Sequence, residues 1–173
     1  MDIWKRNRVA LGWTLGCLCL GVGQVGCGRS EPHPPLDSAA GHGHVHTAKY
    51  GGVLVEVGEH QFNLEVLVDP AVGKLTLWTL DAHAESYVRI ATKSVELVAK
   101  VGEGSEQPLV VEAVANPATG EVAGNSAQFE GRADWLKGAK DVEGRIKSIT
   151  LGTKTFTDLK FDWPHGTTSG HQH

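Results

Sequence analysis

Apolar and polar side chains alternate in short runs between residues 48 and 163, and this alternation limits the possible folds more than any other feature of the chain. In Phe62–Val68 (FNLEVLV), every second residue is Phe, Leu or Val, and Ser94–Val101 (SVELVAKV) alternates in the same way. Successive side chains of a strand point to opposite faces, so a period of two is typical of a strand that buries one face. These runs therefore predict strands rather than helices.

Turn residues separate the runs and indicate how neighbouring strands connect. Asp69–Gly73 (DPAVG) predicts a hairpin between the runs on either side of it, and Gly152-Thr153 joins the last two runs. Only Ala133–Lys140 has a helical pattern, and Gly138 limits it to a turn or two. We predict an all-β domain, an antiparallel β-sandwich or barrel with one short helix. The expected strands are Gly52–Val57, Phe62–Val68, Lys74–Leu80, Tyr87–Ala91, Ser94–Val101, Leu109–Val114, Ala127–Arg132, Arg145–Leu151 and Lys154–Trp163.

The first 26 residues are typical of a segment that directs export. Three basic residues in MDIWKRNR precede an uncharged apolar stretch that is shorter than the about 20 residues of a transmembrane helix. The segment ends in Val25-Gly26-Cys27, which resembles the lipobox of a bacterial lipoprotein signal. The resemblance implies a lipid on Cys27 that anchors the protein to a membrane, on the periplasmic side of the bacterial cell envelope. Ordinary secretion and an uncleaved anchor are the alternatives.

Cysteine content and charge exclude several classes of function. Cys17 and Cys19 lie within the predicted signal and Cys27 would carry the lipid, so the mature chain would have no free thiol. Thiolate metal sites, disulfides and cysteine nucleophiles are therefore not expected. The net charge is -4 with the histidines neutral, which argues against a nucleic-acid-binding protein.

Two polar segments flank the predicted strands. Residues 27–47 are rich in Gly, Pro, Ser, Ala and His, and residues 164–173 (PHGTTSGHQH) are similar. Neither segment has enough large apolar residues to bury a core. The expected organisation is a lipoprotein-type signal peptide at 1–26, a flexible tether at 27–47, an all-β domain at 48–163 and a His-containing tail at 164–173.

Seven of the nine histidines lie in these two flanks. His42, His44 and His46 occupy alternate positions, which point to the same side of an extended backbone. Neutral imidazole is a ligand for Zn, Cu and Ni, so the three rings can converge on one divalent cation. The alternative is a solvated linker without metal. A second, looser set consists of His165, His171 and His173.

Two more histidines lie within the predicted domain. His60 falls in a turn between two strands, and His83 follows the end of a strand, between Asp81 and Glu85. The alternate positions of Asp81, His83 and Glu85 would allow nitrogen and oxygen ligands to face one ion. The alternative is that each histidine is an ordinary exposed loop residue.

Nothing in the chain points to catalysis. Motifs for nucleotide binding and the nucleophile elbow are absent, and we expect the protein not to be an enzyme. Three glutamates are expected on the solvated face of a sheet rather than beside a nucleophile: Glu56, Glu59 and Glu65. Three tryptophans are expected to pack in the core or at sheet edges rather than to bind sugar: Trp78, Trp135 and Trp163.

The stretch Tyr50–Glu65 (YGGVLVEVGEHQFNLE) resembles a β-rich module that accompanies periplasmic adaptor subunits of heavy-metal efflux pumps of the resistance-nodulation-division type. Gly73–Leu77 and Leu80–Glu85 continue the resemblance. The matching residues are Gly51, Gly52, His60 and His83, whereas Tyr50 and Asn63 stand where the module has histidine. The resemblance implies an extracytoplasmic, metal-associated β-domain and an efflux-pump component as a partner.

These features together predict a lipoprotein that handles divalent transition metals without catalysis, as a buffer, a carrier or an accessory to heavy-metal efflux. Metal binding needs unprotonated imidazole, so we expect binding to fade as the pH drops through about 6.5. The alternative is an envelope module that docks a protein partner and has no metal role.

Overall fold

The computed structural model describes residues 46–166. The predicted signal, Cys27, most of the tether with His42 and His44, and the C-terminal His171 and His173 lie outside the described residues, so these predictions stay predictions. Within residues 46–166, no helix is long and apolar enough to cross a membrane.

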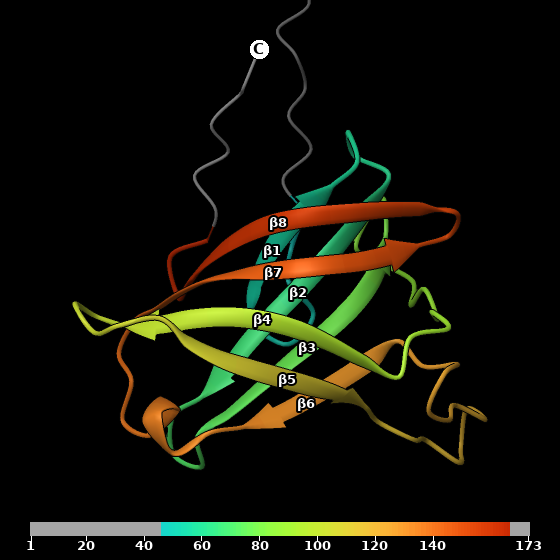
Figure 1. The fold of residues 1–173 in the computed structure, drawn as a ribbon. Helices are drawn as coiled ribbons and strands as arrows, with labels where there is room; N and C mark the ends of the chain where they lie inside the picture. Colours follow the sequence, from blue (N-terminus) through green and yellow to red (C-terminus); the bar gives the residue numbers. More distant parts are fainter. Residues whose placement is uncertain (1–45, 167–173) are drawn as a thin grey trace, which may run out of the picture. The chain divides into compact units, whose positions relative to one another are not determined.

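Eight antiparallel strands form a single sheet in the order β1-β2-β3-β6-β5-β4-β7-β8 (Figure 1). One 3-10 turn, η1 (Asp134–Leu136), lies between β6 and β7. The strands are β1 (Val53–Val57), β2 (Phe62–Asp69), β3 (Lys74–Asp81), β4 (Ser94–Val101), β5 (Gln107–Ala113), β6 (Gln128–Arg132), β7 (Val142–Leu151) and β8 (Lys154–Trp163). The predicted all-β class is thus confirmed, as are the predicted β2–β3 hairpin and the turn between β7 and β8.

The sheet curls until its two edge strands, β1 and β8, lie close to each other, which makes a nearly closed barrel. Figure 1 shows β4, β5 and β7 crossing in front of β1, β2 and β3. One apolar cluster fills the space between these strands, and its largest fully buried side chain is Phe129. Alternate positions of β1 to β5 enter this core, for example Leu64 and Val66 of β2 and Val95 and Leu97 of β4, which is the physical basis of the period of two.

The other face of β2 and β3 is also buried, which the alternation did not predict. Trp78, Leu80 and Ala84 form a second apolar cluster on this outer face of the sheet, with Leu54 and Leu67 packed against it. Two segments belong to this side of the domain: residues 46–52, hereafter the strap, and residues 82–93, hereafter the β3–β4 loop.

The expectation that Glu65 lies on a solvated face is wrong, because its side chain is fully buried next to the strap. Glu56 and Glu59 are exposed, as expected. Trp78 is buried, and Trp135 and Trp163 pack against the main core, as expected for packing residues.

Three strand predictions differ from the structure. Residues 87–91 form only isolated bridges, Leu80 with Tyr87 and Ile90 with Ser126, instead of a strand. Strand β5 begins at Gln107 rather than at the expected Leu109, whereas the expected helix of a turn or two at 133–140 is present as the single turn η1. Strand β7 begins at Val142, before the expected Arg145, because residues 142–144 extend the ladders with β4 and β8.

Candidate functional site

The strap is attached to the sheet through the Glu65 carboxylate. Glu65 Oε2 accepts a hydrogen bond from the backbone N–H of Lys49 at 2.8 Å, and Oε1 accepts from the N–H groups of Tyr50 at 2.8 Å and Gly52 at 3.0 Å. A Cβ atom at Gly52 would lie 2.5 Å from the carbonyl oxygen of Val66, so this close approach requires glycine. The strap therefore follows β2 at backbone contact distance.

Side chains of the strap also reach the β3–β4 loop. The Tyr50 ring stacks on Trp78 with a centroid distance of 4.2 Å, and its hydroxyl shares a hydrogen bond with that of Tyr87. Lys49 Nζ donates to the backbone carbonyl of Glu85 and lies 4.7 Å from the centre of the Tyr87 ring. Lys49 and Tyr50 therefore join two segments that are more than thirty residues apart in the sequence.

A local turn at the end of β3 fixes the start of the β3–β4 loop. Asp81 Oδ1 accepts hydrogen bonds from the backbone N–H groups of His83 at 3.2 Å and Glu85 at 2.9 Å. Partial burial raises the pKa of the Asp81 carboxyl, but hydrogen bonds from Glu85, Ser86 and His83 outweigh this effect and lower the pKa. Asp81 thus serves the backbone turn that presents His83, a pattern typical of aspartate in turns.

His46 of the strap and His83 of the β3–β4 loop lie together. Their ring centroids are 6.0 Å apart, with the ring planes inclined at 60°. Both line a hollow of about 420 Å³, together with Thr47, Lys49, Ala84 and Glu85. Two of the histidines singled out in the sequence, one from the flank and one from the domain, therefore meet at the same place.

This spacing suits two ligands of one metal ion. With a metal–nitrogen bond of about 2.0–2.1 Å, the centroid of a coordinating imidazole lies roughly 3.2 Å from the ion. Two such rings on one ion have centroids roughly 5 Å apart at a tetrahedral angle and at most roughly 6.4 Å apart when they lie on opposite sides of the ion. The 6.0 Å between His46 and His83 lies near the upper limit, so a tetrahedral ion would draw the two rings closer together by roughly 1 Å.

The hollow does not contain a complete coordination shell among the described residues. No group of three or more His, Cys, Asp and Glu side chains within residues 46–166 is placed to hold a metal ion. The expected combination of Asp81, His83 and Glu85 as ligands is thus not formed, because the Asp81 carboxylate binds the backbone of the turn. A metal at His46 and His83 would need further ligands from water or from the preceding residues of the chain.

The other described histidines lie apart from this hollow. His60, in the β1–β2 turn, is exposed, and its Nδ1 lies 2.9 Å from Glu56 Oε2. His165 is exposed just after β8. Neither residue lines the hollow at His46 and His83.

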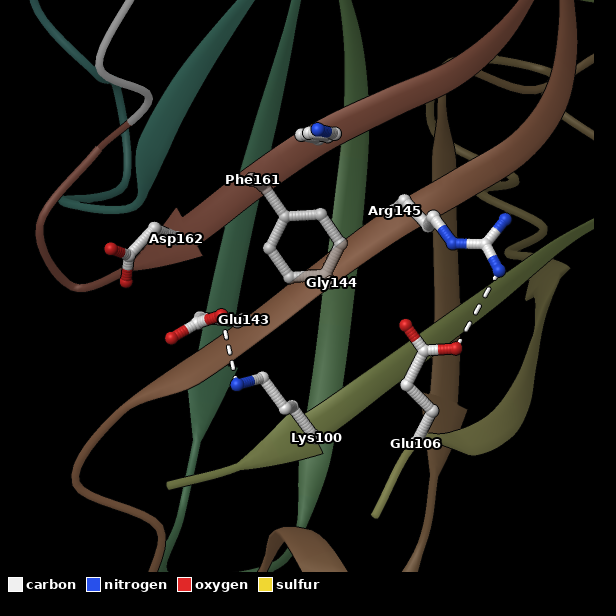
Figure 2. Close-up of a pocket in the computed structure, with 8 residues that line it drawn as sticks. Lys100, Glu106, Glu143, Gly144, Arg145, Phe161 and Asp162 are labelled. Carbon is white, nitrogen blue, oxygen red and sulfur yellow. Dashed lines mark ion pairs between the residues drawn. The ribbon is translucent and has the colours of Figure 1, made fainter. Parts of the chain in front are cut away.

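A second hollow, of about 330 Å³, lies over β4, β7 and β8 and is lined by charged residues around Phe161 (Figure 2). Lys100 Nζ lies 3.1 Å from Glu143 Oε2, and Arg145 Nη2 lies 3.5 Å from Glu106 Oε2. The hydrogen bond and the negative charge of Glu143 raise the pKa of Lys100. Because these charges neutralise one another, this hollow is a weaker candidate for ligand binding than the one at His46 and His83.

Two residues that organise the site, Glu65 and Asp81, were not identified from the sequence in these roles. Asp81 had a usable signal, since an aspartate at a strand end commonly accepts hydrogen bonds from the backbone two residues later. For Glu65 the sequence holds no comparable signal, because its partners in the strap become neighbours only in the folded domain.

Comparisons of the chain with models of protein families, with curated proteins and with solved structures found no match.

Proposed function

We propose that this protein is an extracytoplasmic lipoprotein that binds divalent transition metals, Zn, Cu or Ni, and handles them near the membrane without catalysis, as an accessory to heavy-metal efflux. The observation that carries the proposal is the pair His46 and His83, whose rings lie 6.0 Å apart in one hollow. The lipid anchor on Cys27 and the efflux partner rest on the sequence resemblances.

The His42, His44 and His46 run supplies a source of the missing ligands. In an extended chain, His44 would present its imidazole on the same side as His46, roughly 6.5 Å further along the backbone. His83 would then be the one ligand provided by the barrel, and His46 and His44 would be provided by the strap and the tether. Water or a fourth residue would complete a tetrahedral site.

The charge of the chain is compatible with this role. The net charge is -4 with neutral histidines, which favours cations over anions weakly at physiological salt. The donor atoms are imidazole nitrogens, and Glu85 is among the residues that line the same hollow. This set of donors suits Zn, Cu and Ni better than Mg or Ca, which prefer oxygen ligands.

An envelope protein-interaction module remains the second candidate, because Tyr50 and Tyr87 are 48% and 46% exposed next to the same hollow. Tyrosine is enriched in protein interfaces. In that case the two histidines would be polar residues at the rim of a docking surface.

Calorimetric titration with Zn, Cu(II) and Ni at pH 7.5 tests the metal proposal. We expect His83→Ala and His46→Ala each to weaken binding by about tenfold or more, since each removes a direct ligand. His60→Ala is the matched control, because His60 is exposed and outside the hollow, and it should leave the affinity unchanged. A triple alanine variant at His42, His44 and His46 should abolish the binding.

Equal heats in the wild type and the His83→Ala variant would contradict the proposed site. If no metal produces heat in the wild type, the metal proposal fails as a whole and the interaction module becomes the better reading.

A further inference from the structure

We infer that Glu65 is a positioning residue for this metal site: it fixes the strap to the outer face of β2 and thereby places His46 opposite His83. The inference rests on the proposed function for its metal-binding part. Its structural part, the attachment of the strap by Glu65, is testable without metal.

The burial of Glu65 is the first argument. Its side chain is fully buried between Leu54 of β1 and Trp78 of β3, its neighbours in the two ladders. A buried carboxylate is costly unless it is well hydrogen-bonded. Here the strap supplies three backbone N–H donors, from Lys49, Tyr50 and Gly52. The N–H donors of the strap therefore stabilise the buried carboxylate, and the carboxylate in turn holds the strap against the sheet.

The position of Lys49 is the second argument. Its backbone N–H is bound to Glu65, three residues after His46 in the chain. Its side chain donates to the carbonyl of Glu85, two residues after His83. Lys49 therefore connects the carboxylate to both sides of the hollow, and loss of its attachment at Glu65 would release the strap end that carries His46.

The two oxygens of Glu65 have different partners, which makes a conservative substitution informative. Oε2 accepts a hydrogen bond from the backbone N–H of Lys49, and Oε1 accepts hydrogen bonds from those of Tyr50 and Gly52. In Glu65→Gln one oxygen becomes an NH₂ group, which donates hydrogen bonds and cannot accept them. The amide oxygen can serve Tyr50 and Gly52, and the Lys49 N–H then faces another donor. The attachment nearest to His46 is thus lost while the side-chain volume is retained.

The first experiment measures the strap in the metal-free protein. Amide hydrogen exchange in Glu65→Gln should be at least about tenfold faster at Lys49 than in the wild type, with the amides of β2 little affected. Glu112→Gln, an exposed glutamate of β5, is the matched control and should show wild-type exchange throughout. Unchanged exchange at Lys49 in Glu65→Gln would overturn the inference, whatever the metal result.

The second experiment is a double-mutant cycle on the affinity for Zn. We expect Glu65→Gln to weaken Zn binding by about tenfold to a hundredfold, as residues that orient metal ligands commonly do. In a His46→Ala background the same substitution should have a clearly smaller effect, limited to the placement of the residues that precede His46, because Glu65 acts mainly through His46. An equal loss in both backgrounds would mean that Glu65 acts on the whole fold and would overturn its positioning role.

A second variant leaves Glu65 intact in case Glu65→Gln fails to fold. Tyr50→Ala removes the stack on Trp78 and the hydrogen bond to Tyr87. It should also weaken Zn binding, and its effect should likewise be clearly smaller when His46 is replaced by alanine. Wild-type protein that binds no Zn would refute the proposed function, whereas wild-type affinity in both variants would refute the positioning of His46 alone.

Discussion

The only two tyrosines of the chain, Tyr50 and Tyr87, link the strap to the β3–β4 loop through a hydrogen bond between their hydroxyl groups. Burial, followed by this hydrogen bond and by the nearby negative charges, raises the pKa of Tyr87 from 10.0 to about 12. A raised pKa means that the folded protein favours the protonated phenol. The stabilisation is therefore fully present below pH 10.0 and is lost as the pH rises through about 12.

A Tyr50→Phe variant tests this link between residues. We expect the pKa of Tyr87 to fall from about 12 toward 10.0 without reaching it, because the burial remains while the hydrogen bond is removed. Tyrosinate absorbance measures the change, and Tyr87 is then the only phenol in the chain. An unchanged titration in the variant would show that Tyr50 does not contact Tyr87 in solution.

Among the elements, the β1–β2 turn shows the clearest conflict between residue type and backbone geometry. Gly58, Glu59 and His60 have φ values of 69°, 54° and 64°, all in the left-handed region. Only Gly58 adopts this conformation freely. For a residue with a Cβ atom, the left-handed conformation destabilises the fold by roughly 1–2 kcal/mol because of steric strain. The contact between His60 and Glu56 is exposed and offsets little of this cost.

We expect the double variant Glu59→Gly/His60→Gly to be more stable than the wild type, by roughly 1 kcal/mol. The removed steric cost exceeds the roughly 0.5–1 kcal/mol that a glycine loses in conformational entropy. Chemical denaturation measures the free energy of unfolding, and Glu103→Gly, an exposed position without a positive φ, is the control that should not gain stability. Metal affinity should be unaffected, because neither residue lines the hollow at His46 and His83.

At the scale of the whole molecule, the barrel is closed by side chains where its edge strands meet. Phe62 at the start of β2 and Phe156 near the start of β8 pack edge to face, with ring centroids 6.4 Å apart. A Cβ atom at Gly58 would lie 2.9 Å from the Phe156 ring, so the end of β1 also contacts this pair. Within the described chain, β1 and β8 are the two edge strands of the sheet and have no ladder between them. At this junction between β1 and β8, hereafter the seam, side-chain contacts such as these take the place of backbone pairing.

We expect Phe156→Ala to destabilise the protein by less than the about 3–5 kcal/mol typical of a fully buried Phe, since Phe156 is only partly buried. A double-mutant cycle with Phe62→Ala should show a coupling of about 0.5–1.5 kcal/mol. Amide exchange should rise first in β1 and β8. Val110→Ala, at a residue that is 49% exposed, is the control and should stay within about 0.5 kcal/mol of the wild type. A coupling energy of zero would show that the contact between Phe62 and Phe156 does not hold the two edge strands together.

Much of the architecture was predictable from the sequence alone. The predicted bounds of β4 and β8, Ser94–Val101 and Lys154–Trp163, agree with the structure, because strand alternation and turn residues are local properties of the chain. Prediction failed where another segment covers the strand. Glu65 follows the alternation of an exposed position, yet it is buried because the strap lies over it.

The candidate site divides in the same way. The sequence by itself determined the all-β class and which histidines are available as ligands. The alternation of apolar residues, the turn residues and the residue types are all local properties of the sequence. Only the tertiary structure decided that His46 would meet His83 rather than His60, and that Asp81 would bind backbone. The physical reason is that these neighbours are far apart in the chain. Their approach depends on the burial of one carboxylate and one aromatic stack, which no local pattern encodes.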